Sequence, residues 1–218
     1  MKRITLALSC LIFIQLANAQ VLKGSLFTGG SANITSTTVN YSAGQEVKSN
    51  IWSISPQLGI GIQQNKVLGI QLFAGANSYE GSNGMTSKSS GKYYGGGFFY
   101  RQYFPVHNKW MLFGQANVSA SFGNGKSSNE GIKTDRNTSW GIGLGVTPGI
   151  GFQISKKVWL EASMANLLGI NYNCQKSDIL DPSGTVTSTS TRKDFSAIAS
   201  VNGFSGINLG IRWIIPKS

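Results

Sequence analysis

The chain has 218 residues and a net charge of +11, but only 12% of its residues are charged. Soluble proteins carry about 25% charged residues, so this composition argues against an ordinary soluble domain. After residue 19, no segment approaches the roughly 18 consecutive apolar residues of a membrane helix. A membrane protein with this sequence would therefore cross the bilayer as strands, and its length suits one domain.

Residues 1–19 are predicted to be a secretory signal peptide that is cleaved from the mature chain. Lys2 and Arg3 form the positive start, an apolar stretch follows, and Ala17-Asn18-Ala19 is a typical cleavage site. A lipoprotein site at Cys10 is the alternative, but it would leave the apolar stretch too short. Cleavage leaves Cys174 as the single cysteine, which excludes an intramolecular disulfide bond.

The clearest structural pattern runs from Trp140 to Ile154. Every even position is large and apolar or proline, and every odd position is glycine or polar. Successive side chains of a strand point to opposite faces, so the pattern predicts a strand with one bulky and one small face. A bulky face suits hydrocarbon and a small face suits a narrow interior, as in a transmembrane β-barrel. Eight strands are predicted, at about residues 21–35, 50–63, 67–79, 93–105, 109–122, 138–154, 158–172 and 203–215.

The predicted connections alternate in length. Tight turns are expected at 64–66, 106–108 and 155–157, and long polar loops at about 36–49, 80–92, 123–137 and 173–202. Short periplasmic turns and longer external loops are typical of bacterial outer-membrane barrels. The predicted fold class is therefore all-β, an eight-stranded antiparallel up-and-down transmembrane β-barrel.

Aromatic residues near the strand ends favour the same interpretation, because such residues form girdles at membrane interfaces. Seven of them are predicted to face outward, whereas Phe27, Phe99, Phe113 and Trp159 fall on the predicted inward face. The outward residues are Trp52, Trp110, Trp140, Trp213, Tyr94, Tyr100 and Tyr172.

Four segments carry a resemblance to a known family: S-P-Q-L-G-I at 55–60, F-F-Y-R-Q-Y-F-P at 98–105, W-M-L-F-G-Q-A at 110–116 and P-G-I-G-F at 148–152. In these the chain resembles the outer-membrane β-barrel domain family, the OmpA/OmpX-like "porin family" group of small barrels. The resemblance implies that residues 20–218 form a domain of the cell outer membrane, placed there by the outer-membrane insertion machinery. Members usually end on an aromatic residue which that machinery recognises, whereas this chain ends W-I-I-P-K-S. Either Trp213 serves in its place or the last strand is recognised inefficiently.

Four charged residues fall on the predicted inward face: Lys23, Arg101, Glu161 and Arg212. Chain position places all four near the turn end of the barrel. A buried charge is costly unless it is paired, so Glu161 is expected to bridge to Arg101 or Arg212. We interpret the cluster as a structural plug of the lumen, with a proton or ion pathway as the alternative. Eight strands enclose just enough space for side chains, so no solute channel is expected.

Two other protein classes fit the sequence less well. A lipid-modifying barrel enzyme uses a histidine with serine and an acid near the outer rim, but the single histidine, His107, lies in a predicted turn. The chain has no metal-ligand or phosphate-loop spacing, so no catalytic, cofactor or metal site is expected. A soluble lipocalin-type barrel packs its large residues inward, which is the reverse of the pattern here.

Basic residues gather in the predicted loops. They face either solvent or an anionic partner, namely outer-leaflet lipid headgroups or surface polysaccharide. An exported chain does not meet nucleic acid, so that partner is excluded. The expected role is structural or surface interaction, with an unidentified partner at the long loops, and a narrow porin-like channel is the alternative. The basic residues are Lys48, Lys88, Lys92, Lys126, Lys133, Arg136, Lys176, Arg192 and Lys193.

Overall fold

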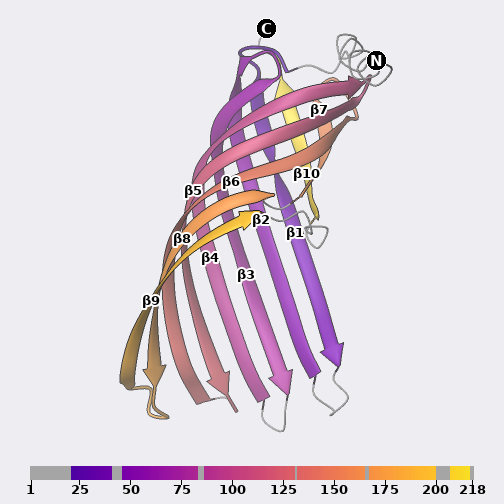
Figure 1. The fold of residues 1–218 in the computed structure, drawn as a ribbon. Helices are drawn as coiled ribbons and strands as arrows, with labels where there is room; N and C mark the ends of the chain where they lie inside the picture. Colours follow the sequence, from indigo (N-terminus) through magenta and orange to yellow (C-terminus); the bar gives the residue numbers. More distant parts are fainter. Residues whose placement is uncertain are drawn as a thin grey trace, which may run out of the picture.

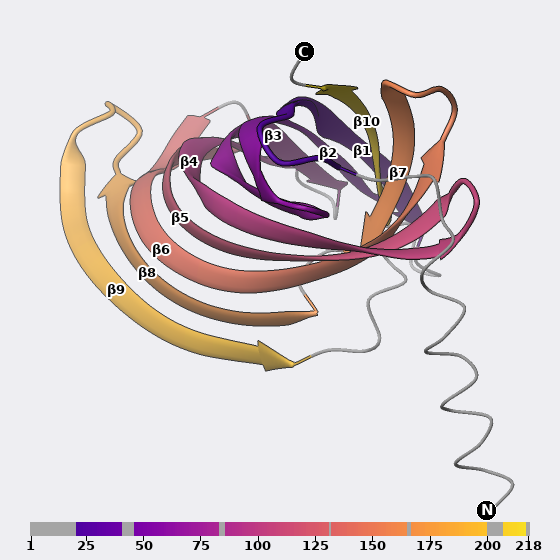
Figure 2. The same cartoon turned by 90° about the horizontal axis from the view of Figure 1, so that it is seen from above.

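The computed structural model describes residues 21–40, 46–82, 86–130, 132–164, 167–199 and 207–216. They form one antiparallel sheet of ten strands that curls around an interior (Figures 1 and 2). The predicted signal peptide, residues 1–19, lies outside the described residues. No helix among the described residues is long and apolar enough to span a bilayer. The strands are β1 Leu26–Asn40, β2 Glu46–Gln63, β3 Lys66–Ser82, β4 Thr86–His107, β5 Trp110–Asn129, β6 Ile132–Gln153, β7 Val158–Met164, β8 Leu168–Leu180, β9 Val186–Ala199 and β10 Ile207–Ile215.

Closure of the sheet differs between its two ends. Pairing follows chain order from β1 to β6 and then returns through β7 and β10 to β1. The contact that closes this ring, β1 with β10, covers Leu26–Ala32 only, at the end with the short turns. Beyond Ala32 the described residues of β1 pair with β2 alone, and β9 pairs with β8 alone. In Figure 1, β9 and the far end of β1 lie at opposite margins of the sheet.

The all-β, antiparallel, up-and-down architecture is confirmed, and so are the three tight turns. Asn65 and Asn108 take positive φ values of 60° and 30°, a conformation that asparagine tolerates better than most residues. The third turn is fixed by Ser155, whose Oγ accepts hydrogen bonds from the backbone N–H groups of Lys157 and Val158.

The prediction of four long loops was wrong for the described residues, which are largely strand there. β4 and β6 begin at Thr86 and Ile132, inside predicted loops, and β9 lies wholly within the predicted loop 173–202. The predicted strand 158–172 is divided into β7 and β8. Serine, threonine and asparagine occupy both faces of these extensions, so hydrophobic alternation gave no signal, while backbone hydrogen bonding continued the ladder.

The bulky faces point outward, as predicted. Trp140, Ile142 and Leu144 are 43%, 51% and 53% exposed, and the same holds for large residues on every neighbouring strand. Exposed apolar area on this scale is rare on soluble monomers and marks a surface that contacts another apolar phase. The outer wall is therefore the surface that contacts lipid.

The glycines of the inner face make room for large inward side chains. Gly59 lies directly opposite Phe27, and Gly149 lies opposite Phe113. A Cβ atom on Gly149 would collide with the ring of Phe113. Near the short turns the glycine-rich wall thus pairs with bulky residues, with Gly151 opposite Met111, whereas farther along β6 Gly141 and Gly143 lie opposite serines.

The apolar core lies inside the sheet near the short turns. Trp159, predicted to face inward, is only 1% exposed there. The core consists of Val21, Phe27, Val67, Phe99, Tyr103, Met111, Phe113, Trp159 and Ile214.

Candidate functional site: a buried ion-pair network

Arg101 of β4 and Glu161 of β7 meet across the interior. One guanidinium nitrogen, Nη1, lies 2.8 Å from Oε1 and 2.7 Å from Oε2 of the carboxylate. Their side chains are 2% and 3% exposed. β4 and β7 are not neighbours in the sheet, so this pair spans the lumen.

The other donors of Arg101 are satisfied by glutamines. Its Nε and Nη2 donate to Oε1 of Gln115, at 2.9 and 2.6 Å, and Nη2 also donates to Oε1 of Gln57 at 3.2 Å. Gln71 joins the network because its Oε1 accepts from the amides of Gln57 and Gln115. Strands β2, β3 and β5 thus contribute one glutamine each, in addition to the charged residues of β4 and β7.

Aromatic groups enclose the ion pair. The hydroxyl of Tyr103 donates to Oε1 of Glu161 at 2.8 Å and accepts from Nη1 of Arg101 at 3.0 Å. The guanidinium carbon of Arg101 lies 4.4 Å from the ring centroid of Phe113 and 5.2 Å from that of Phe27. A cation within about 6 Å of a ring face is attracted to it. The arginine is therefore held by charge, hydrogen bonds and rings together.

Arg212 of β10 is the second cation beside Glu161. Its Nε lies 3.1 Å from Oε2 of the carboxylate, but makes no hydrogen bond of good geometry among the described residues. Its Nη1 donates to the carbonyl of Ile211 at 3.1 Å. Two cations and one anion therefore share a site from which water is almost excluded.

Lys23 does not join this network, so the prediction that it belongs to the charge cluster was wrong. It is exposed and lies in a turn ahead of β1, which begins at Leu26 rather than at the predicted residue 21. Gly24 follows it with a φ of +82°, so strand alternation does not extend back to Lys23. Of the four predicted residues, the structure brings Arg101, Glu161 and Arg212 together.

The three glutamines, Gln57, Gln71 and Gln115, were not predicted as part of the cluster. They could have been found by combining two facts: all three face inward, and the strand register places Gln115 directly opposite Arg101 and Gln57 opposite Gln71. Register across four strands depends on turn geometry, and the sequence pattern alone did not supply it.

A polar hollow of about 360 Å³ lies on the side of the network away from the short turns. Arg101, Arg212 and the three glutamines line its base, and serines and asparagines line its walls. Within the described part of the chain, no group of three or more histidine, cysteine or acidic side chains is placed to hold a metal ion. The site can hold and neutralise charge and can bind water or small polar molecules.

Comparison with known proteins places this geometry in a family. A model of the outer membrane protein beta-barrel domain matches residues 5–206. The outer membrane protein OprG from Pseudomonas aeruginosa has a TM-score of 0.52 and 12% sequence identity, over 92% of this chain and 100% of OprG. No curated protein matches the sequence.

Two further solved structures are similar in outline. Neisserial surface protein A has a TM-score of 0.37 and 15% identity, over 88% of this chain and 97% of that protein. A major outer membrane protein from Thermus thermophilus has a TM-score of 0.45 and 12% identity, over 88% of this chain and 99% of its own. With a family match over most of its length and an outer wall built for lipid, the chain belongs to the outer membrane protein β-barrel domain family and is a protein of the outer membrane.

Proposed function

We propose that the protein is an eight-stranded barrel with a lumen filled by side chains, and that its role in the envelope is structural or in surface interaction. In this proposal β7 with β8 forms the seventh wall strand, and β9 with β10 forms the eighth. Register supports this, because β6 pairs with β7 up to Ser163 and with β8 from Leu168 onward. Likewise Met164 pairs with Ile207 of β10, and Leu168 pairs with Ala199 of β9.

The Arg101–Glu161 pair carries the proposal of a filled lumen. It joins opposite walls at 2.7 Å, and both side chains are almost fully buried. Breaking such a pair would leave a buried charge without its partner, which is strongly unfavourable. A water-filled channel past this point would require the pair to separate.

A narrow channel for ions is the second candidate. The polar hollow of about 360 Å³ supports it, because the hollow leads to Arg212 and Arg101. Its excess of positive charge would favour anions. We propose no catalytic role, since His107 is exposed at the turn end of β4, away from the buried network.

The partners in this proposal are membrane lipids, including anionic headgroups, and the outer-membrane insertion machinery. An unidentified surface partner would meet the hairpin ends of the strands. The polar ends of β2 to β6 replace the predicted long loops as the surface available for that contact.

Cysteine labelling tests the proposed orientation. In a Cys174→Ser background, Ser87→Cys should react with a membrane-impermeant maleimide on intact cells, because Ser87 is exposed next to a hairpin end. Gln64→Cys, in an exposed short turn, should react only after the outer membrane is permeabilised. Labelling of Gln64→Cys on sealed cells would contradict the orientation.

Planar-bilayer recording tests the filled lumen. Purified protein should give no stable porin-sized conductance steps. Small anion-selective steps that change with Glu161→Gln would favour the narrow channel, and large reproducible steps would exclude a side-chain-filled interior.

A further inference from the structure

The outer face of β2 to β6 changes from apolar to basic toward the ends of the strands that lie away from the short turns. Directly opposite residues on adjacent strands share a face, so rows across this face follow from the register. One row is Ile54, Ala74, Tyr94 and Phe122; the next is Trp52, Ala76, Lys92 and Asn124; the next is Asn50, Ser78, Ser90, Lys126 and Arg136.

Three cations lie together on this face. Lys126 of β5 is directly opposite Arg136 of β6, and Lys92 of β4 is on the adjoining row, opposite Asn124. Like charges directly opposite each other destabilise a sheet. An arrangement of this kind is stabilised when an anion binds between the cations.

The protein neutralises only part of the charge of this cluster. Among the described residues, Lys92 and Lys126 are exposed and make no ion pair, and only Arg136 has a partner, Asp178, at 3.0 Å. By contrast, Lys88 on the next outward row pairs with Glu80 at 2.9 Å. On these two neighbouring rows Lys88 is therefore paired, whereas Lys92 and Lys126 are not.

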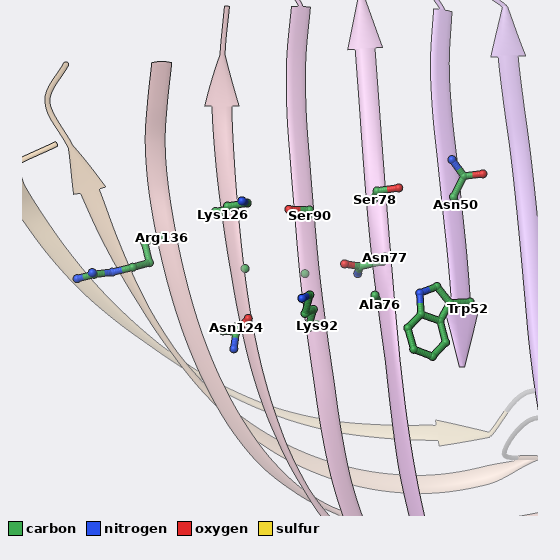
Figure 3. A pocket seen from close by; sticks show the side chains of 12 residues that line it. Asn50, Trp52, Ala76, Asn77, Ser78, Ser90, Lys92, Asn124, Lys126 and Arg136 are labelled. Carbon is green, nitrogen blue, oxygen red and sulfur yellow. The ribbon is translucent and has the colours of Figure 1, made fainter. Parts of the chain in front are cut away.

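The three cations border a hollow of about 620 Å³ (Figure 3). In Figure 3, Arg136, Lys126 and Lys92 come from three neighbouring strands, and Trp52 lies across the hollow from Arg136. Tryptophan is enriched at the level of lipid headgroups, where its ring contacts both apolar and polar groups. The hollow therefore lies where headgroups are expected.

An apolar groove of about 470 Å³ adjoins the hollow on the membrane side. Small residues form its floor: Ala74, Gly96 and Ala120, which lie on three consecutive strands. Large apolar residues border it, including Tyr94 and Phe122, whose ring centroids are 6.0 Å apart. The groove is therefore a recess between large outward-facing apolar side chains.

We propose that this face binds one phosphate-bearing lipid of the outer leaflet, with its phosphate at Lys92, Lys126 and Arg136 and an acyl chain in the apolar groove. The spacing fits, because Lys92 lies two residues from Tyr94, about 7 Å along the strand. Headgroup regions are about 5–8 Å thick on each side of the hydrocarbon core. An acidic protein would satisfy the cations but would not enter a groove that faces hydrocarbon. The assignment to the outer leaflet rests on the orientation proposed above.

Native mass spectrometry of the full chain in a neutral detergent tests the site. The probe is a bis-phosphorylated, acylated lipid A, compared with its dephosphorylated form and with phosphatidylcholine. The wild type should retain one lipid A molecule and much less of either comparison lipid. Lys126→Gln should weaken binding about fivefold and Lys92→Gln with Lys126→Gln about 25-fold, since each cation contributes about one such factor at a lipid surface. Lys193→Gln is the matched control, because Lys193 is also exposed on the outer face but lies on β9.

A second variant tests the acyl chain separately. Ala120→Leu should fill the groove and weaken lipid A binding about fourfold for each methylene group displaced, while all charges remain. The proposal would be overturned if Lys126→Gln and Lys193→Gln lost lipid A binding equally, or if Ala120→Leu left lipid A binding unchanged. It would also be overturned if equimolar inorganic phosphate displaced the lipid. In detergent the protein has no inner or outer leaflet, so lipid A binding does not depend on the orientation in the membrane. The binding experiment would therefore stay informative even if cysteine labelling showed the inverted orientation.

Discussion

The two ends of the sheet differ in strand pairing and in the side chains that fill the narrow interior. Near the short turns every strand of the ring has two neighbours, and the interior holds an apolar core and a buried ion-pair network. Toward the hairpin ends, the described residues of β1 and β9 do not pair with each other. The inner residues there are mostly serine, asparagine and glycine.

This difference indicates that closure and inner packing depend on each other. Arg101 and Glu161 connect walls that are not neighbours, so they hold the curled sheet together from inside. At the far end the described residues of β1 and β9 do not pair with each other, and residues at these margins are strongly exposed: Ile34 of β1 by 84% and Phe195 of β9 by 73%. The ring thus closes at the end where the inward side chains are large, and the described margins stay apart at the end where they are small.

The largest expected effect is at the closed end. Glu161→Gln would leave Arg101 and Arg212 without their anion, and breaking a buried pair lowers the free energy of unfolding by about 3–5 kcal/mol. The urea midpoint for unfolding in lipid vesicles should fall accordingly. Glu130→Gln, at an exposed hairpin end, is the control and should leave the midpoint unchanged. Equal midpoints for the two variants would show that the network does not hold the ring closed.

A smaller effect is expected from the glycine pairs. Gly149→Ala places a methyl group against the ring of Phe113, and such overpacking destabilises by about 1–3 kcal/mol. Gly114→Ala on the neighbouring strand is the matched control, because its Cβ meets no atom within 4 Å. Phe113→Leu should partly rescue Gly149→Ala in urea unfolding. Similar midpoints for Gly149→Ala and Gly114→Ala would contradict the pairing of glycine with aromatic residues.

A local effect is expected where the ring opens. Within β1, amides of Leu26–Ala32 are held between two neighbours, whereas residues 33–40 pair with β2 alone. Amides of the second segment that point away from β2 should exchange with solvent about a hundredfold faster or more. Residue-resolved hydrogen exchange in micelles measures this difference. Uniform protection along β1 would mean that the ring is closed along its full length.

Sequence alone predicted the parts of this fold where the environment of a strand face dictates which type of residue it carries. Residues 140–154 show their outward face because hydrocarbon requires bulk on every second position. Arg101, Glu161 and Arg212 were found because a charge on an inward face needs a partner. The tight turns were found because a few polar residues separate two alternating stretches.

The missed parts lack such a constraint. β9 contains T-S-T-S-T, which is polar on both faces, so its strand character depends on pairing with β8 rather than on its own pattern. Lys23 was misplaced because alternation was extended through a turn containing Gly24. The glutamines around Arg101 required register, which two-residue periodicity does not define across strands.

The smallest expected effect lies at the open end, where the Arg136–Asp178 ion pair joins an exposed cation to a mostly buried carboxylate. Hydrogen bonds from Arg136 and from the hydroxyl of Thr189 hold the pKa of Asp178 below its ordinary value. A carboxyl group whose pKa is lowered by folding adds stability above its unfolded pKa of about 3.9, and that stability is lost as pH falls through the folded pKa. Asp178→Asn should therefore increase hydrogen exchange of β8 and β9 slightly at pH 7, with the difference from wild type disappearing at strongly acidic pH. In the same experiment Glu161→Gln should increase exchange only through global unfolding. A global effect of Asp178→Asn, or a difference that persists undiminished in acid, would show that the open end is held by more than the ion pair of Asp178.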